Sequence, residues 1–144
     1  MAITTNAIAS SFKKELLEGK HDFTASTGSA FKLAMYNSNA VLGKSTTSYT
    51  TGSEVTSPAG YTAGGKALVN TGTSVSSSVA ITTFGNLSFT NVTLTARGAL
   101  IYNTSNANSA VAVLDFVDNK TATAGTFTIQ FPAYTTSAAI LRIS

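Results

Sequence analysis

The sequence contains no cysteine and no tryptophan, and only one histidine and two prolines. Without cysteine the chain has no disulfide framework and no thiolate metal site. No stretch reaches the roughly 18 apolar residues that a membrane-spanning helix needs. Residues 1–20 also lack the apolar core of a secretory signal peptide, and they carry acids as well as bases. We therefore expect synthesis in a cytoplasm and no membrane partner.

Charge is also scarce, because charged residues form only 10% of the 144 residues, against roughly 25% in ordinary soluble domains. The net charge is +3, and the bases are scattered, with only Lys13 and Lys14 adjacent. A nucleic-acid-binding protein needs several phosphate contacts from one basic face. We therefore expect no nucleic-acid partner.

Hydroxyl residues take the place of the missing charges, with 18 serines and 24 threonines. Threonine is β-branched and suits the half-exposed surface of a pleated sheet. Two interpretations follow. The composition is that of an ordinary β-rich domain, or it is that of a surface adapted to protein contacts, which disfavour lysine and glutamate.

Alternation of apolar and polar residues between turn signals predicts about eight strands and an antiparallel β-sandwich. Gly98 is a plausible bulge in the longest of them. The loop at 43–65 is too long for a hairpin, which favours a jelly-roll or Greek-key arrangement over a meander. The predicted strands are 31–36, 66–70, 75–81, 87–89, 92–103, 110–117, 126–131 and 138–143, with turns at 90–91 and 118–125.

One helix is predicted, over residues 6–18, with Asn6 or Ser10 as its N-terminal cap and Gly19 as its left-handed C-terminal cap. Ile8, Phe12 and Leu16 recur every four residues and form its apolar face. A helix this short is marginal in isolation. It must dock, either on its own domain or on a partner.

This pattern divides the chain into an N-terminal arm with the helix, residues 1–20, and a single β-sandwich domain, residues 21–144. The 43–65 loop carries only two large side chains, Tyr49 and Tyr61. They could pin the loop to the sandwich or form a contact surface, where tyrosine is enriched.

Candidate chemistry is weak. His21 is the only histidine, no G-x-S-x-G motif is present, and we interpret His21 as a turn or cap residue. Glu15 and Glu18 are too close in sequence to flank a sugar as a glycosidase pair would. Asp115 lies in an apolar strand, where Arg97 or Arg142 is a candidate partner for an ion pair. No histidine, cysteine and carboxylate spacing matches a metal site. We expect no catalytic residue, cofactor or metal, and no enzyme.

Several blocks, in order along nearly the whole chain, give a more specific indication. They are SFKKELLEGKHDF (11–23), FKLAMY (31–36), the segment from Tyr49 through Glu54 to Gly65, TARGALIYN (95–103) and AVLDF (112–116). These blocks resemble a small structural protein that many tailed bacteriophages and prophages encode, the capsid cement or decoration protein. None of the blocks is a catalytic motif.

The resemblance implies a small jelly-roll protein, often dimeric, that bridges major capsid subunits on the exterior of the head. The expected partners are the major capsid protein and further copies of the chain, as a dimer or trimer, and the expected location is the virion after synthesis in the host cytoplasm. A head-fibre or tail module that binds a receptor or glycan stays open as the alternative. Our candidate contact residues are Phe12, Lys13 and Leu16 in the arm and Tyr49 and Tyr61 in the loop.

Overall fold

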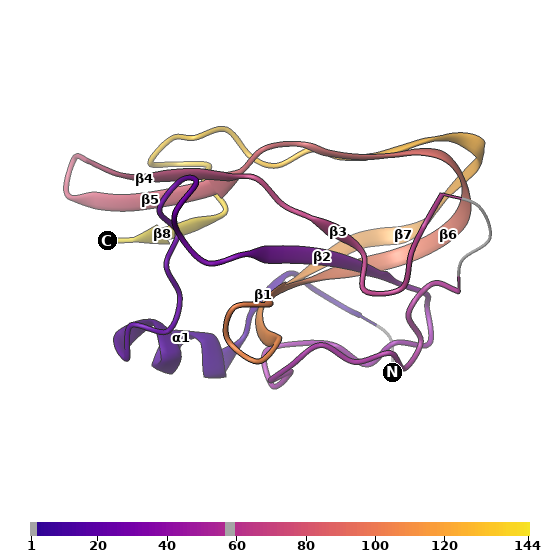
Figure 1. The fold of residues 1–144 in the computed structure, drawn as a ribbon, viewed down its shortest axis with the longest axis horizontal. Coiled ribbons are helices and arrows are strands. Elements are labelled where there is room, and N and C mark those ends of the chain that lie inside the picture. The colour runs from indigo at the N-terminus through magenta and orange to yellow at the C-terminus, as the bar shows by residue number, and fades with distance from the viewer. Residues whose placement is uncertain (1–2, 57–59) are drawn as a thin grey trace.

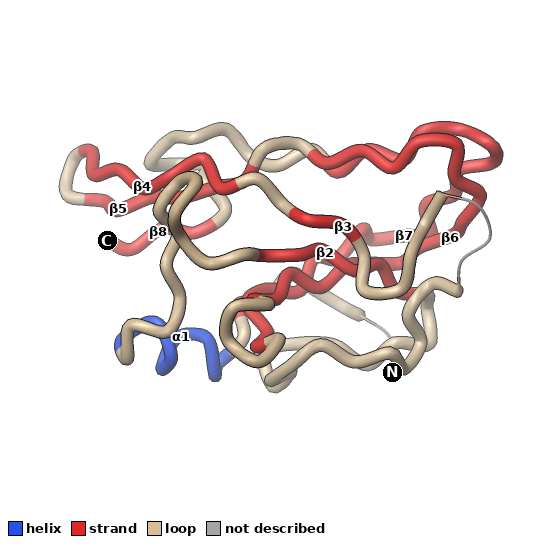
Figure 2. The backbone as a smooth tube through the Cα atoms, viewed as in Figure 1, coloured by secondary structure: helices blue, strands red, loops and turns tan. Residues whose placement is uncertain are grey.

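A computed structural model of the chain, which describes residues 3–56 and 60–144, contains two antiparallel β-sheets and one short helix, α1 (Ser10–Leu17). Figures 1 and 2 show the strands in two layers, with α1 beside the end of the molecule that also holds the C-terminus. The predicted all-β sandwich with an N-terminal helix is therefore confirmed. The jelly-roll connectivity stays a prediction.

The larger sheet has the strand order β1-β7-β6-β2-β3, and the smaller sheet has the order β4-β5-β8. The strands of the larger sheet are β1 (Ala7–Ile8), β2 (Phe31–Tyr36), β3 (Lys66–Ala67), β6 (Leu87–Asn103) and β7 (Ser109–Ile129). Those of the smaller sheet are β4 (Asn70–Ser76), β5 (Val79–Phe84) and β8 (Leu141–Ile143).

The long β6–β7 hairpin organises both layers. Its register runs from Asn103 opposite Ser109 to Leu87 opposite Ile129, and Figure 1 shows the ribbon curling from one layer over to the other. Asn91, Val117 and Ala124 have positive φ angles within these strands, and the register shifts near Asn91 and between Ala96 and Gly98. Bulges of this kind bend and twist a strand.

The turns predicted at 90–91 and 118–125 are therefore wrong, because these residues lie within the continuous strands β6 and β7, which local bulges interrupt without ending the pairing. The strand predicted at 75–81 is also wrong, since Ser77 and Ser78 both adopt positive φ and form the turn between β4 and β5. Two successive left-handed residues are what a tight two-residue hairpin turn requires. The predicted strand 66–70 is split, because the chain leaves the larger sheet after Ala67 and enters the smaller one at Asn70. The last strand is shorter than predicted and starts at Leu141.

The helix also begins later than predicted, because Ala7 and Ile8 pair with Val113 and Ala112 of β7. Ala9 precedes the helix without a side-chain cap, and Asn6 instead accepts a hydrogen bond from the backbone N–H of Asp115, at 2.6 Å. Neither Asn6 nor Ser10 is therefore the cap. The C-terminal cap is as predicted, since Gly19 has a φ of 74° and its N–H donates to the carbonyl of Leu16.

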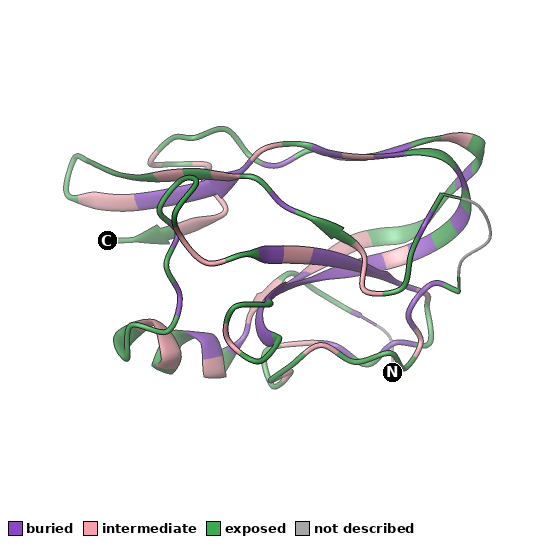
Figure 3. Ribbon diagram, in the orientation of Figure 1, coloured by how far each residue is buried: buried purple, intermediate pink, exposed green. Residues whose placement is uncertain are grey.

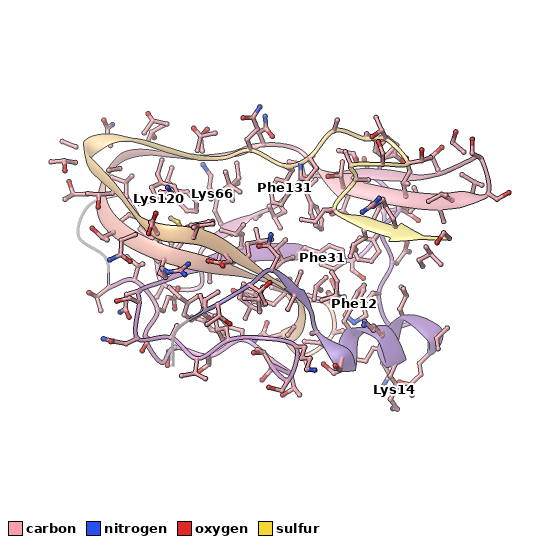
Figure 4. All side chains as sticks on the ribbon, turned by 180° about the vertical axis from the view of Figure 1, so that it is seen from behind. Phe12, Lys14, Phe31, Lys66, Lys120 and Phe131 are labelled. Carbon is pink, nitrogen blue, oxygen red and sulfur yellow. The ribbon has the colours of Figure 1, made fainter. Side chains whose placement is uncertain are left out.

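The core lies between the layers and includes described residues of the 1–20 segment. Ile3 and Ala9 are fully buried and Phe12 is 2% exposed. Figure 3 shows the buried residues following β2 and the adjoining half of β6, with exposed residues on the outer side of α1. Phe12, Phe23, Phe31, Phe84 and Phe131 form a chain of aromatic contacts with centroid separations of 4.6 to 6.0 Å. Figure 4 shows Phe12, Phe31 and Phe131 pointing into the space between the layers.

Candidate partner-binding surface

The side chains of α1 divide into an inner and an outer set. Phe12 points inward, where its ring lies 4.7 Å from that of His21 and 6.0 Å from that of Phe23. The helix thus packs on its own domain, which was one of the two possibilities that the sequence left open. Because the Phe12 side chain is buried, it supports the surface from beneath and is not itself available to a partner, contrary to its selection as a contact residue.

Lys13, Leu16 and Leu17 lie on the outer side of the helix. Lys13 is exposed, Leu16 is half-buried and Leu17 is 91% exposed. All three line a groove of about 930 Å³ between α1 and the smaller sheet, which we call the helix–sheet groove. The predicted residues Lys13 and Leu16 therefore come together on one surface.

The opposite wall of the helix–sheet groove comes from β5, β8 and the segment before β8. Ile81 and Phe23 are buried at its floor, whereas Val79 and Leu141 are half-buried and Ile143 is 60% exposed. A contiguous apolar surface that is exposed to solvent commonly marks a site of contact with another protein.

A buried polar chain fixes the end of α1 against the β6–β7 hairpin. The Nδ2 of Asn103 lies 2.9 Å from the Nδ1 of His21, and the Nε2 of His21 lies 2.7 Å from a carboxylate oxygen of Glu15. The Oδ1 of Asn103 accepts from the N–H of Ser105, so the amide group faces the ring as a donor. His21 Nδ1 therefore accepts, and Nε2 carries the proton that is donated to Glu15. His21 is 6% exposed and joins two elements, which the sequence interpretation as a turn residue did not foresee.

One buried carboxylate joins several parts of the 43–65 loop, of which residues 57–59 lie outside the described residues. Glu54 accepts hydrogen bonds from the hydroxyls of Tyr49 and Tyr61, both at 2.6 Å, and from the N–H of Gly64 at 2.7 Å. The hydroxyl of Tyr61 in turn accepts from the N–H of Met35 in β2. Burial, followed by the hydrogen bond to Glu54, raises the pKa of both tyrosines well above its ordinary value.

Both tyrosines therefore pin the loop to the sandwich, which was one of the two alternatives. Tyr61 is 4% exposed, so its side chain is not available to a partner, contrary to its selection as a contact residue. Tyr49 is half-buried, and its ring stacks on that of Tyr102 at 4.7 Å. Of the five candidate contact residues, Lys13, Leu16 and Tyr49 thus keep accessible surface.

A second groove, of about 830 Å³, runs along β7, and we call it the β7 groove. Its lining includes half-buried Phe116 and exposed Lys120, and it shares Ile8 and Ile140 with the helix–sheet groove. The two grooves therefore adjoin at β1 and at the segment before β8. Beside this surface the side chain of Asp115 forms an ion pair with Arg97, which was one of the two partners predicted for it. The hydrogen bond from Arg97 lowers the pKa of Asp115.

Comparison with protein-family models, with curated proteins and with solved structures found no match to this chain. Within residues 3–56 and 60–144, no helix is long and apolar enough to cross a membrane. The same residues contain no cluster of three or more histidine, cysteine or carboxylate side chains placed to hold a metal ion.

Sequence reasoning missed the sheet side of the helix–sheet groove, above all Arg142 and Ile143. The alternation over 138–143 predicted a strand but gave no sign of what lay beside it. The exposure of Ile143 follows from the position of β8 as the last strand of its sheet. Leu17 was detectable from the sequence, because it lies next to the apolar face of the helix and not within it. A leucine at such a position is expected to be exposed to solvent.

Proposed function

We propose that the chain is a structural protein of a tailed-bacteriophage virion, a capsid cement protein that bridges major capsid subunits on the exterior of the head. The family resemblance of its sequence blocks suggests this role. The structural observation that carries it is the helix–sheet groove, with Leu17 and Ile143 exposed at 91% and 60% on its two walls. Apolar side chains held open to solvent on a well-packed scaffold suit a contact made after folding.

Two adjoining grooves suit a bridging role, because a cement protein has to contact more than one neighbour. A stable protein contact buries about 1,200–2,000 Å² in total. Repetition of a modest contact over a symmetric shell, together with self-association of the chain as a dimer or trimer, adds avidity. Cementing in this sense is binding alone and requires no reaction.

The scaffold is suited to bearing load between subunits. The β6–β7 hairpin belongs to the larger sheet and curls over toward the other layer (Figure 1), and the aromatic chain from Phe12 to Phe131 joins the helix to both sheets. The Glu54 network holds the longest loop against β2. A rigid body of this kind loses little conformational entropy when it docks, which favours binding.

The experiment that tests this function is to add the purified full-length protein to expanded phage heads prepared without it. We expect it to co-sediment with the heads, to raise their resistance to heat, and to be located on the head exterior by cryo-electron microscopy. Absence from heads would overturn the proposal. Location on the tail or fibres, or specific binding on a glycan array, would favour the receptor-binding alternative instead.

A further inference from the structure

The strand β8 presents an unpaired edge to the helix–sheet groove. It pairs with β5 through Ala80 opposite Ile143 and Thr82 opposite Leu141, and it is the last strand in the order β4-β5-β8. Figure 1 shows β8 as the strand of this sheet nearest to α1. Within the described parts of the chain no strand pairs with its other edge. An open edge carries backbone N–H and C=O groups that can pair with another extended chain.

The groove beside this edge offers places for apolar side chains. Leu16 and Leu17 approach from α1, and Val79, Leu141 and Ile143 from the sheet. In an extended chain, side chains alternate between two faces, so a strand added to β8 would direct every second side chain toward this apolar surface. This combination of a free edge and an apolar groove is the arrangement used in recognition by strand addition.

The charges of the groove indicate the chemistry of the occupant. Among the described residues that line it, the charged side chains are Lys13, on the helix wall, and Arg142, on β8. Both are exposed, and among the described residues neither forms an ion pair. Arg142 makes one long hydrogen bond, at 3.4 Å, to the carbonyl of Thr136. Two cations on facing walls favour an occupant that carries a carboxylate.

The geometry points to an extended segment of a partner protein, apolar at alternate positions and bearing at least one aspartate or glutamate, which pairs with the free edge of β8 inside the helix–sheet groove. This inference rests on the proposed function, which makes that partner the major capsid protein. It adds the mode of binding and the chemistry of the bound segment. A two-fold pair of copies joined at this edge is disfavoured, because it would bring Lys13 and Arg142 against the same two cations of the other copy.

The test uses full-length protein and purified heads prepared without it. Lys13→Glu and Arg142→Glu are compared with the matched charge reversal Lys44→Glu, which changes an exposed lysine that lines neither groove. Each groove variant should bind heads about tenfold more weakly, because reversal turns an attraction into a repulsion. Lys44→Glu should bind as the unchanged protein does. Unfolding curves show that all three variants are folded.

Hydrogen exchange supplies a second measurement, in which the backbone N–H groups of residues 141–143 should exchange more slowly on heads than in the free protein. If the unchanged protein binds heads but neither variant weakens binding and β8 is not protected, the inference fails and the proposed function stands. If the groove variants alter the sedimentation of the free protein as an oligomer, the groove joins copies of the chain, and the inference also fails. If the unchanged protein does not bind heads, the proposed function fails and the inference fails with it.

Discussion

At the scale of single residues, Val117 is the clearest conflict between side chain and backbone. It has a φ of 72° within β7 and is 71% exposed. A β-branched residue in the left-handed region is a genuine outlier. The strand accepts this conformation because the N–H of Val117 donates to Asp115, at 2.8 Å, next to the ion pair with Arg97. The bulge is thus held by its neighbours and not by the valine.

We therefore expect Val117→Gly to raise the free energy of unfolding by about 0.5–1 kcal/mol. Relief of left-handed strain, about 1–2 kcal/mol, should exceed the entropic cost of glycine, about 0.5–1 kcal/mol. Val75→Gly is the matched control, because Val75 is equally exposed, at 71%, and lies in β4 without a positive φ. That variant should lose about 0.5–1 kcal/mol. Urea unfolding measures both, and an equal loss in the two variants would show that Val117 is not strained.

At the scale of elements, Glu54 joins separate parts of the 43–65 loop, because its carboxylate is 6% exposed and accepts three hydrogen bonds from within the loop. We expect Glu54→Gln to lower the free energy of unfolding by about 1–3 kcal/mol. The amide cannot accept at both of its terminal atoms, so one tyrosine hydroxyl would face another donor. Hydrogen exchange should also become faster between residues 49 and 56. Asp118→Asn, at an exposed acid, should change stability by less than about 0.5 kcal/mol.

The role of Glu54 in ordering the loop would be disproved if Glu54→Gln lowered the free energy of unfolding but left hydrogen exchange in the loop unchanged. Glu54 would then act only as a buried core residue. Tyr49→Phe separates the contributions further, because it removes one hydrogen bond and leaves the ring stacked on Tyr102. It should cost about 1 kcal/mol, less than the change at Glu54.

The elements also show how far the sequence predicts this fold. Strands with clean alternation, such as Phe31–Tyr36, were predicted at their observed bounds. The bulges within the long strands were not predicted, because a polar pair such as Thr90-Asn91 fits a turn and a bulge equally well. Only the pairing with β7 decides between the two. Similarly, Ala7 and Ile8 fit the helical period, but pairing with β7 draws them into a strand.

The candidate surface could be predicted only in part, because a local pattern does not show how an element packs. The helical period grouped Phe12 with Leu16, but it does not say which side of the helix meets the core. Phe12 is buried and Leu16 stays at the groove. The sequence analysis left two roles open for the tyrosines of the loop, as anchors or as a contact surface, and Glu54 between them in the sequence was the available sign that they are anchored by hydrogen bonds.

At the scale of the whole molecule, the question is whether residues 1–20 form a separable arm. The buried side chains of Ile3 and Phe12 belong to the same core as the strands, and β1 pairs with β7. Burial of each large apolar side chain stabilises a fold by about 1.5–3 kcal/mol. Loss of these two alone would remove about 3–6 kcal/mol from a total that is typically about 5–15 kcal/mol. The arm is therefore expected to be part of the cooperative unit.

Deletion of residues 1–20 should accordingly lower the melting temperature by at least about 10 °C, or abolish cooperative unfolding, and should expose apolar surface to a fluorescent dye. Circular dichroism and dye binding measure both effects. Full-length Leu17→Ser is the control, because Leu17 is 91% exposed and its loss should leave the melting temperature unchanged within about 2 °C. A truncated chain that melts like the full-length protein would show that the arm is separable. If the truncated chain melts at a lower temperature, its failure to bind heads would reflect its unfolding and not the loss of a contact. In that case only substitutions on the surface of the helix–sheet groove can measure how that surface contributes to binding.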